Sequence, residues 1–247
     1  MPIDQPVFLA LGLGFVLGLK HAMDADHVVA VATIVSEQLS VFRAALVGVL
    51  WGVGHSASLL VAGILVIFLR MAIPEPVAAF LELAVALMIV FLGGRILYLL
   101  LRSRKEVHVH AHSHDGVTHS HLHFHGGQDA HQPTTSHIHD GARHGKSVGF
   151  RPLIVGMVHG LAGSAALTLL VLTEVLRGGS RMLGMGYLLV FAAGSIGGML
   201  LMSVVLSLPF VLTSVRFERV NVPLRLFAGV GSVLFGMYYA WLNVAGA

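Results

Sequence analysis

The segment LKHAMDADHVV, residues 19–29, carries ionisable side chains between two apolar flanks. Eight consecutive residues include Lys20, His21, Asp24, Asp26 and His27. On insertion scales such a group costs about 2.5–3.5 kcal/mol at the centre of a bilayer, and residues of this kind mark ion pathways. Imidazole and carboxylate ligands without sulfur suit Ni²⁺, Co²⁺, Zn²⁺ or Mn²⁺ and disfavour Cu⁺. The segment therefore predicts a divalent-cation site inside a membrane; the alternative is an ion-paired knot that only fixes helix packing.

The spacing of these residues predicts a broken helix. Successive residues of a straight α-helix turn by about 100°, so Asp24 neighbours both His21 and His27. His21, Asp26 and His27 do not share one face, and the helix must unwind or kink for all three to reach one ion. Broken helices near the middle of the membrane are typical of transporters. Lys20 is expected to offset one of the two carboxylates.

Two further histidines, His55 and His159, lie in other apolar segments, within GHSAS and VHGLAGSA. The small residues around each of them allow another helix backbone to come close. Histidine inside a membrane marks ion pathways, so both are predicted to be metal ligands or to support the ligands. The alternative is a packed, hydrogen-bonded histidine.

Histidine also alternates with small or apolar residues in a central loop. Residues 108–144 contain twelve of the sixteen histidines, in patterns such as HVHAHSH and HSHLHFH. In an extended chain every second side chain shares a face, so neighbouring imidazoles can chelate a metal ion. The segment has too little apolar content for a core and is expected to be disordered without metal; a pH-sensitive polar linker is the alternative. The predicted loop ligands are His108, His110, His112, His114, His119, His121, His123, His125, His137 and His139.

Composition indicates an integral membrane protein. Of the 247 residues 56% are hydrophobic and only 11% are charged, against about 25% charged in soluble domains. The absence of cysteine excludes disulfides, thiolate metal sites and iron–sulfur clusters. The basic residues lie at helix ends and in loops rather than on one face, which argues against nucleic-acid binding. Because the chain starts without a basic region or a clear cleavage site, no removable signal peptide is expected.

Six apolar segments are long enough to predict transmembrane helices. They cover residues 6–35, 41–70, 77–101, 150–176, 182–212 and 222–244. The two halves also resemble each other: GLKHAMDADHVVAVATIV aligns with GMVHGLAGSAALTLLVLT, which places His21 over His159, and WGVGHSASLLVAG aligns with FAAGSIGGMLLMS, which places His55 over Ser195. The predicted fold is therefore all-α, with six transmembrane helices as two inverted three-helix repeats. The repeats span 1–101 and 148–247, and the His-rich loop spans 102–147.

Lysine and arginine predict the orientation in the membrane. Ten of them lie on the side of the His-rich loop, whereas Arg70, Arg177 and Arg181 lie on the other side. The positive-inside rule then places the loop in the cytoplasm and both termini outside. Arg95, near the inner end of the third segment, is expected to snorkel to the interface. The ten residues are Arg43, Arg102, Arg104, Lys105, Arg143, Lys146, Arg151, Arg216, Arg219 and Arg225.

The block HAMDADH fits the pattern H-x4-D-H, with His21, Asp26 and His27 at the fixed positions. It resembles the signature of the nickel–cobalt transporter (NiCoT) family, and GHSAS resembles the Gly-His-Ser segment of that family's next helix. Six helices with a central His-rich loop look like the shorter UreH-like and nickel–cobalt efflux branches. The resemblance implies a secondary transporter with Ni²⁺ or Co²⁺ as its substrate and no covalent cofactor.

Together these features predict uptake of Ni²⁺ or Co²⁺ across a bacterial inner membrane, with efflux as the alternative direction. The expected partners are the lipid bilayer, the metal ion and a cytoplasmic metallochaperone. No enzymatic activity is expected, because the zinc-protease pattern H-E-x-x-H is missing; ATP use is not expected either, because the chain has no GxxxxGK[ST] loop. A membrane metal sensor or docking protein is the alternative of another class, and it predicts that loss of residues 108–144 matters more than Asp26→Asn.

Overall fold

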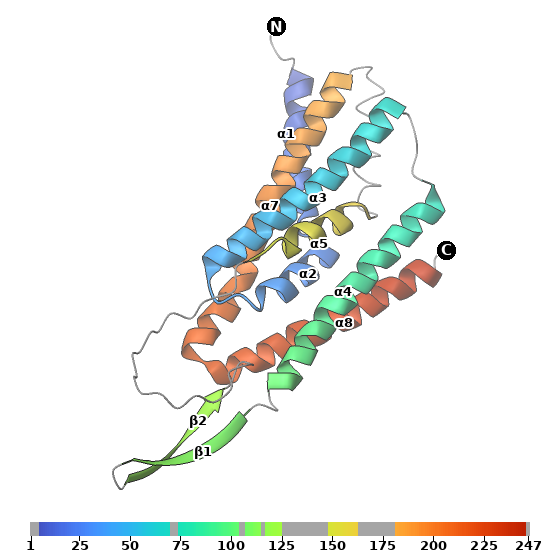
Figure 1. Cartoon of the computed structure of the whole chain (residues 1–247). Coiled ribbons are helices and arrows are strands. Elements are labelled where there is room, and N and C mark those ends of the chain that lie inside the picture. Colours follow the sequence, from blue (N-terminus) through green and yellow to red (C-terminus); the bar gives the residue numbers. More distant parts are fainter. Residues whose placement is uncertain are drawn as a thin grey trace.

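The structure, a computed structural model, describes residues 5–69, 74–103, 107–114, 117–124, 148–162 and 181–245 (Figure 1). Its helices begin and end within a few residues of the boundaries predicted for the apolar segments, where these are described. Of the fourth segment, 150–176, only the part up to residue 162 is described. The helices are α1 (Gln5–His21), α2 (Ala25–Val35), α3 (Val41–Leu69), α4 (Glu75–Ser103), α5 (Arg151–Gly160), α7 (Arg181–Arg216) and α8 (Glu218–Ala245).

Four of these helices are long and apolar enough to cross a membrane. They correspond to Val41–Leu65, Glu75–Arg102, Met182–Ser214 and Arg219–Ala245, and the bent pair Val7–His21 and Ala25–Val35 makes a fifth if it counts as one span. A helix satisfies its backbone hydrogen bonds within the segment, as a lipid environment requires. The prediction of a helical membrane protein is confirmed at this level.

The helices pack in a reciprocal pattern. Helix α1 lies along α7, α3 lies along both α5 and α7, and α4 lies along α8 (Figure 1). The sequence alignment relates α1 to α5 and α3 to α7. The contact between α1 and α7 therefore corresponds to the contact between α5 and α3. The contact between α3 and α7 joins two helices that correspond to each other.

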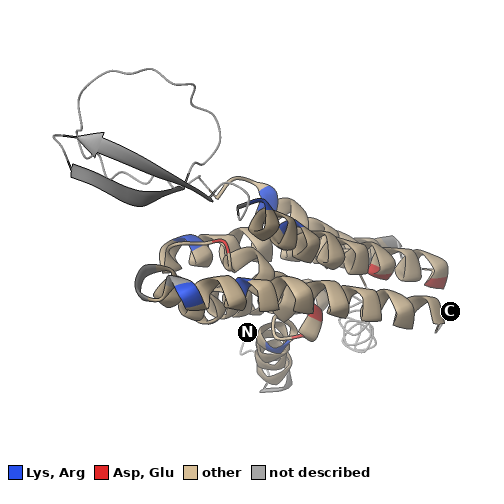
Figure 2. Ribbon diagram, turned by 90° about the horizontal axis from the view of Figure 1, so that it is seen from below, with Lys and Arg blue, Asp and Glu red and all other residues tan. Residues whose placement is uncertain are grey.

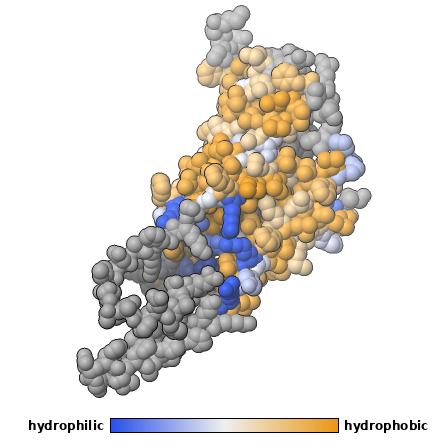
Figure 3. All heavy atoms as spheres, in the orientation of Figure 1, coloured by the Kyte–Doolittle hydropathy of each residue, from blue (hydrophilic) through white to orange (hydrophobic). Residues whose placement is uncertain are grey.

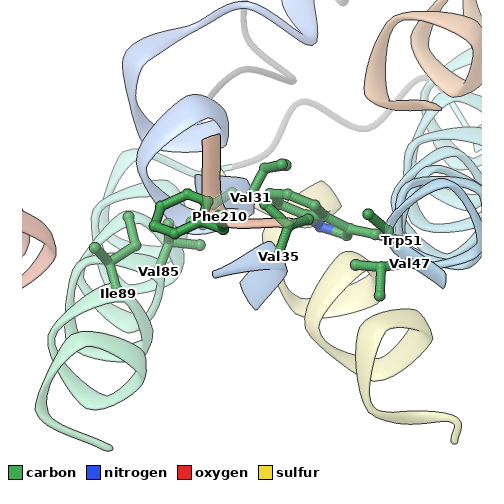
Figure 4. Close-up of a cluster of buried hydrophobic side chains, with 10 residues drawn as sticks. Val31, Val35, Val47, Trp51, Val85, Ile89 and Phe210 are labelled. Atoms are coloured by element: carbon green, nitrogen blue, oxygen red, sulfur yellow. The ribbon is translucent and has the colours of Figure 1, made fainter. Parts of the chain in front are cut away.

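The largest buried apolar cluster lies around α2 and contains residues from most of the helices (Figure 4). Val31 and Val35 of α2 meet Trp51 of α3, Ile89 of α4 and Phe210 of α7. Since α2 is short and contacts α3, α4, α7 and α8, this cluster fixes its position between the longer helices. A smaller cluster of Leu59, Tyr187 and Phe191 packs at the interface of α3 with α7.

The outer surface is apolar, as a lipid-facing surface requires. Phe42, Phe91 and Phe227 expose 78%, 69% and 78% of their surface, and hydrophobic atoms cover most of the helical part in Figure 3. Lysine and arginine gather at one end of the bundle, where α4 ends and α3, α5 and α8 begin (Figure 2). It is the end that carries the His-rich segment, which the positive-inside rule predicted to face the cytoplasm.

The His-rich segment, which we expected to be disordered, contains two antiparallel strands, β1 (Val107–His114) and β2 (Val117–Phe124). Its register opposes three pairs of histidine positions: His108 and His123, His110 and His121, His112 and His119. Valine and threonine alternate with histidine here, and such β-branched residues favour strands. The predicted loop ligands His125, His137 and His139 lie outside the described residues.

Arg95 does not merely snorkel. Its Nη1 atom donates hydrogen bonds to both carboxylate oxygens of Glu37, at 2.6 and 2.8 Å. Glu37 lies in the turn after α2, so this ion pair ties the end of the short helix to α4. The prediction of snorkelling was incomplete, because the sequence around Arg95 does not reveal that Glu37, 58 residues earlier, lies next to it.

Candidate metal site

The predicted break in the first segment is confirmed. Helix α1 ends at His21, α2 begins at Ala25, and the two helix axes differ by 55°. At the break the Met23 amide donates to the carbonyl of Lys20 at 2.8 Å, and the Asp24 amide donates to that of His21 at 3.1 Å. These tight turns replace the regular α-helical pattern and let the side chains on either side of the break face one interior region.

His21 lies at the end of α1 and is held from two sides. Its Nδ1 atom is 2.8 Å from Oδ2 of Asp24, and its Nε2 atom is 2.9 Å from Nε2 of His55 on α3. The His21 side chain is buried, whereas Asp24 is 46% exposed. A carboxylate that accepts the Nδ1 proton fixes the tautomer that leaves Nε2 free to bind a metal ion. Asp24, predicted as a ligand, is therefore placed to orient His21.

Asp26 and His27, in the first turn of α2, reach toward the second half of the chain. One carboxylate oxygen of Asp26 forms a hydrogen bond with Nδ1 of His27 at 3.0 Å, and the other forms one with Nε2 of His159 on α5 at 2.8 Å. His27 is fully buried. Among the described residues its Nε2 atom has no hydrogen-bond partner. A buried ring nitrogen without a partner costs free energy and is available as a ligand.

Three imidazoles surround the ring of His27. The ring centroid of His27 lies 4.5 Å from that of His21, 5.0 Å from His55 and 4.2 Å from His159. The Trp51 ring stacks on His27 at 5.9 Å and meets His159 edge-on at 5.5 Å. Trp51 is fully buried and closes this side of the cluster with an apolar surface.

The coordinating atoms fall into two groups. One consists of His21, His27 and His55, and the other of Asp26, His27 and His159. Within each group the ligand atoms all lie within 4.8 Å of one another. We call the five residues together the His/Asp cluster. On one nickel ion, two ligands at right angles with bonds of about 2.0–2.1 Å lie about 2.9 Å apart, the spacing found between His21 and His55.

Glycines allow the helix backbones that carry these histidines to approach. A Cβ atom on Gly156 or Gly160 of α5 would collide with the carbonyl oxygen of Trp51 or His55 on α3. On the same interface the Ser58 hydroxyl donates to the carbonyl of Met157 at 2.8 Å. Small residues at membrane helix interfaces have this role, and here they bring His159 next to α2 and α3.

Two expectations changed at this site. Lys20 is exposed and, within the part of the chain that is described, forms no ion pair with Asp24 or Asp26; histidines are their partners instead. Trp51 was not singled out from the sequence, although it lies one helical turn before His55, which was the available signal.

Comparisons with known proteins identify the family of this chain. Residues 7–214 match the NicO family, described as high-affinity nickel-transport protein. The chain is 36% identical over 240 residues to the urease accessory protein UreH of Bacillus sp. (strain TB-90), covering 97% of this chain and 94% of the relative. It is 33% identical over 81 residues to the high-affinity nickel transport protein of Cupriavidus necator, covering 32% of this chain and 23% of that protein. No solved structure matches the chain. Because the family model matches residues 7–214 and the Bacillus relative matches over nearly its whole length, this chain belongs to the NicO family of nickel-transport proteins.

Proposed function

We propose that this chain takes up Ni²⁺ across the membrane through the His/Asp cluster. The observation that carries the proposal is the buried Nε2 atom of His27, which has no hydrogen-bond partner among the described residues and has three other imidazoles around it. Imidazole and carboxylate ligands suit Ni²⁺ and Co²⁺. Nickel is favoured over cobalt because the family and the Cupriavidus relative are described by nickel transport.

In this proposal the six residues have different roles. The ligands are the imidazole nitrogens of His21, His27, His55 and His159 and the carboxylate of Asp26. Asp24 orients His21 rather than binding the ion. Ion binding would compensate the partly buried carboxylate of Asp26 and the unpartnered Nε2 atom of His27, which supports a role in transport over a role in packing alone.

The proposed architecture is six spans arranged as two inverted repeats. The alignment of the two halves and the reciprocal packing of α1–α7 and α3–α5 support it, and such repeats carry their site at the repeat interface. The proposed orientation in a bacterial inner membrane has the His-rich segment in the cytoplasm and both termini outside, following the basic residues. Because the chain has no cysteine, single cysteines placed at Ser120 and at Ala245 would test this orientation by labelling from outside intact cells: only Ala245→Cys is expected to react.

A cytoplasmic metallochaperone is the proposed recipient of the ion. The paired strands β1 and β2 oppose three pairs of histidine positions, and imidazole pairs bind nickel. The hairpin would thus hold the ion after transport. Deletion of residues 108–144 is expected to reduce nickel delivery without removing transport.

The test is uptake of radioactive nickel by cells that express the wild type, His21→Ala or Asp26→Asn at equal protein levels. Accumulation above an empty vector that both variants abolish would support uptake through this cluster. Accumulation below the vector, restored by the variants, would make the protein an exporter. If Asp26→Asn is harmless and deletion of 108–144 abolishes function, the protein is a metal sensor or docking protein.

A further inference from the structure

We infer that the His/Asp cluster contains two ion positions that share His27, and that the ion is handed from one to the other during transport. This inference rests on the proposed function and adds an intermediate step to it. The first position is formed by His21, His27 and His55, and the second by Asp26, His27 and His159. We call them the imidazole position and the carboxylate position.

The separation of the ligand atoms argues for two positions. On one ion with bonds of about 2.1 Å, even opposite ligands lie only about 4.2 Å apart. The coordinating atoms of the five residues form two groups of three rather than one group of five.

Each position also has its own close pair. His21 and His55 approach through their Nε2 atoms at 2.9 Å, and Asp26 and His159 approach at 2.8 Å. His27 lies between these pairs, with its ring centroid 5.0 Å from that of His55 and 4.2 Å from that of His159. The geometry therefore places the shared ligand between two preformed pairs.

His27 limits the cluster to one ion at a time. Its Nδ1 atom is engaged by Asp26 at 3.0 Å, which leaves Nε2 as its available ligand atom. A ring nitrogen has one lone pair, so filling one position empties the other. The ion then moves by exchanging His21 and His55 for Asp26 and His159, while His27 remains a partner throughout.

The two positions differ in charge and in the helices that build them. The imidazole position has only neutral ligands, from the end of α1, the start of α2 and the middle of α3. The carboxylate position includes one negative charge and, on α5, the one ligand that the described part of the second half supplies. A movement of α5 relative to α3 would thus change one position and leave the other intact, which is what a sequential transfer needs.

The test measures Ni²⁺ binding to the full-length protein in lipid nanodiscs, with the twelve loop histidines replaced by asparagine so that only the cluster contributes. Equilibrium dialysis gives the stoichiometry and Kd, and nickel X-ray absorption gives the ligands. We expect one ion per chain in this background. His21→Ala and His159→Ala should each keep that ion, with affinity lowered less than about 10-fold because the other position retains three ligands.

The absorption spectra of these two variants should differ. The ion in His159→Ala is expected to show imidazole ligands without a protein carboxylate, and the ion in His21→Ala should show a carboxylate. His27→Ala and the double variant His21→Ala/His159→Ala should both lose binding by at least about 100-fold. Ser232→Ala, which removes a buried serine hydrogen bond between α8 and α4 and touches neither the cluster nor the α3–α5 interface, is the matched control and should bind like the background protein.

Loss of binding in His21→Ala or His159→Ala as complete as in His27→Ala, with a folded and monodisperse protein, would show a single ion position and overturn this inference. The proposed function would stand in that case, because uptake would still require the cluster. If the background protein itself bound no nickel, the proposed function and this inference would both fail.

Discussion

The interface of α1 with α7 and the interface of α3 with α5 have the same backbone contacts but different side-chain chemistry. At the first, Gly18 lies against the carbonyl of Phe191; at the second, Gly156 lies against the carbonyl of Trp51. The sequence alignment relates these two contacts to each other. One way of crossing two helices is thus used twice.

The side chains at the matching positions diverge. His55 on α3 corresponds to Ser195 on α7, and both are fully buried. Among the described residues the Ser195 hydroxyl has no hydrogen-bond partner, whereas His55 contacts His21. The comparison teaches that the scaffold and the ligands are separable: the crossings are shared by both halves, while four of the five residues of the His/Asp cluster belong to the first.

The largest effect should come from His27, because both groups of ligand atoms include it. His27→Ala is expected to reduce uptake of radioactive nickel at least about 100-fold, since it removes the one residue that both groups of ligand atoms share. In the alignment its counterpart in the second half is Ala165. Uptake within about two-fold of wild type would contradict the central position that we give to His27.

His55 and Ser195 test the divergence at matching positions. His55→Ala is expected to lower nickel uptake by about 10–100-fold because it removes a ligand. Ser195→Ala should leave uptake near wild type and leave stability unchanged or slightly increased, since it removes a buried hydroxyl without a described partner. Equal losses in the two variants would mean that the matching sites share a chemical role. Uptake and thermal unfolding of the purified proteins measure both effects.

Gly18 and Gly156 test whether the two crossings are equivalent. A Cβ atom at either position would collide with a backbone carbonyl, so Gly18→Ala and Gly156→Ala should each lower the free energy of unfolding by about 1–3 kcal/mol. Gly12→Ala is the matched control, because no atom lies within 4 Å of its new methyl group. Thermal unfolding in nanodiscs ranks the stabilities of the three variants. If only one of Gly18→Ala and Gly156→Ala is destabilised, the two helix crossings are not equivalent.

The smallest effect should come from the ion pair between Glu37 and Arg95. Both side chains are partly exposed, at 23% and 37%, and such pairs contribute about 0–1 kcal/mol. Glu37→Gln should therefore lower stability by no more than about 1 kcal/mol. The charge exchange Glu37→Arg with Arg95→Glu should recover part of that loss. If the exchanged protein is no more stable than Glu37→Gln, the pair has no stabilising role.

Much of the fold and of the site followed from the sequence because the signals were local. The apolar segments predicted the helices, and the spacing of His21, Asp26 and His27 predicted the break between α1 and α2. The partners could not be predicted, because they depend on how distant helices meet: the contact of Asp26 with His159 and that of Glu37 with Arg95 each join residues far apart in the sequence. The contact of Asp24 with His21, on which its proposed orienting role rests, could likewise not be predicted from the sequence.

The break at the end of α1 also has an electrostatic consequence. The last turns of α1 and α5 contain His21 and His159, and the carbonyl end of a helix carries about half a negative charge. Each such end stabilises a nearby cation by about 0.3–1 kcal/mol, and more where the site is partly buried. The positive end of α2, whose first turn includes Asp26, stabilises the carboxylate instead. The carbonyl ends of α1 and α5 would thus help to balance the proposed doubly charged ion inside a lipid environment, while the positive end of α2 favours the ionised carboxylate.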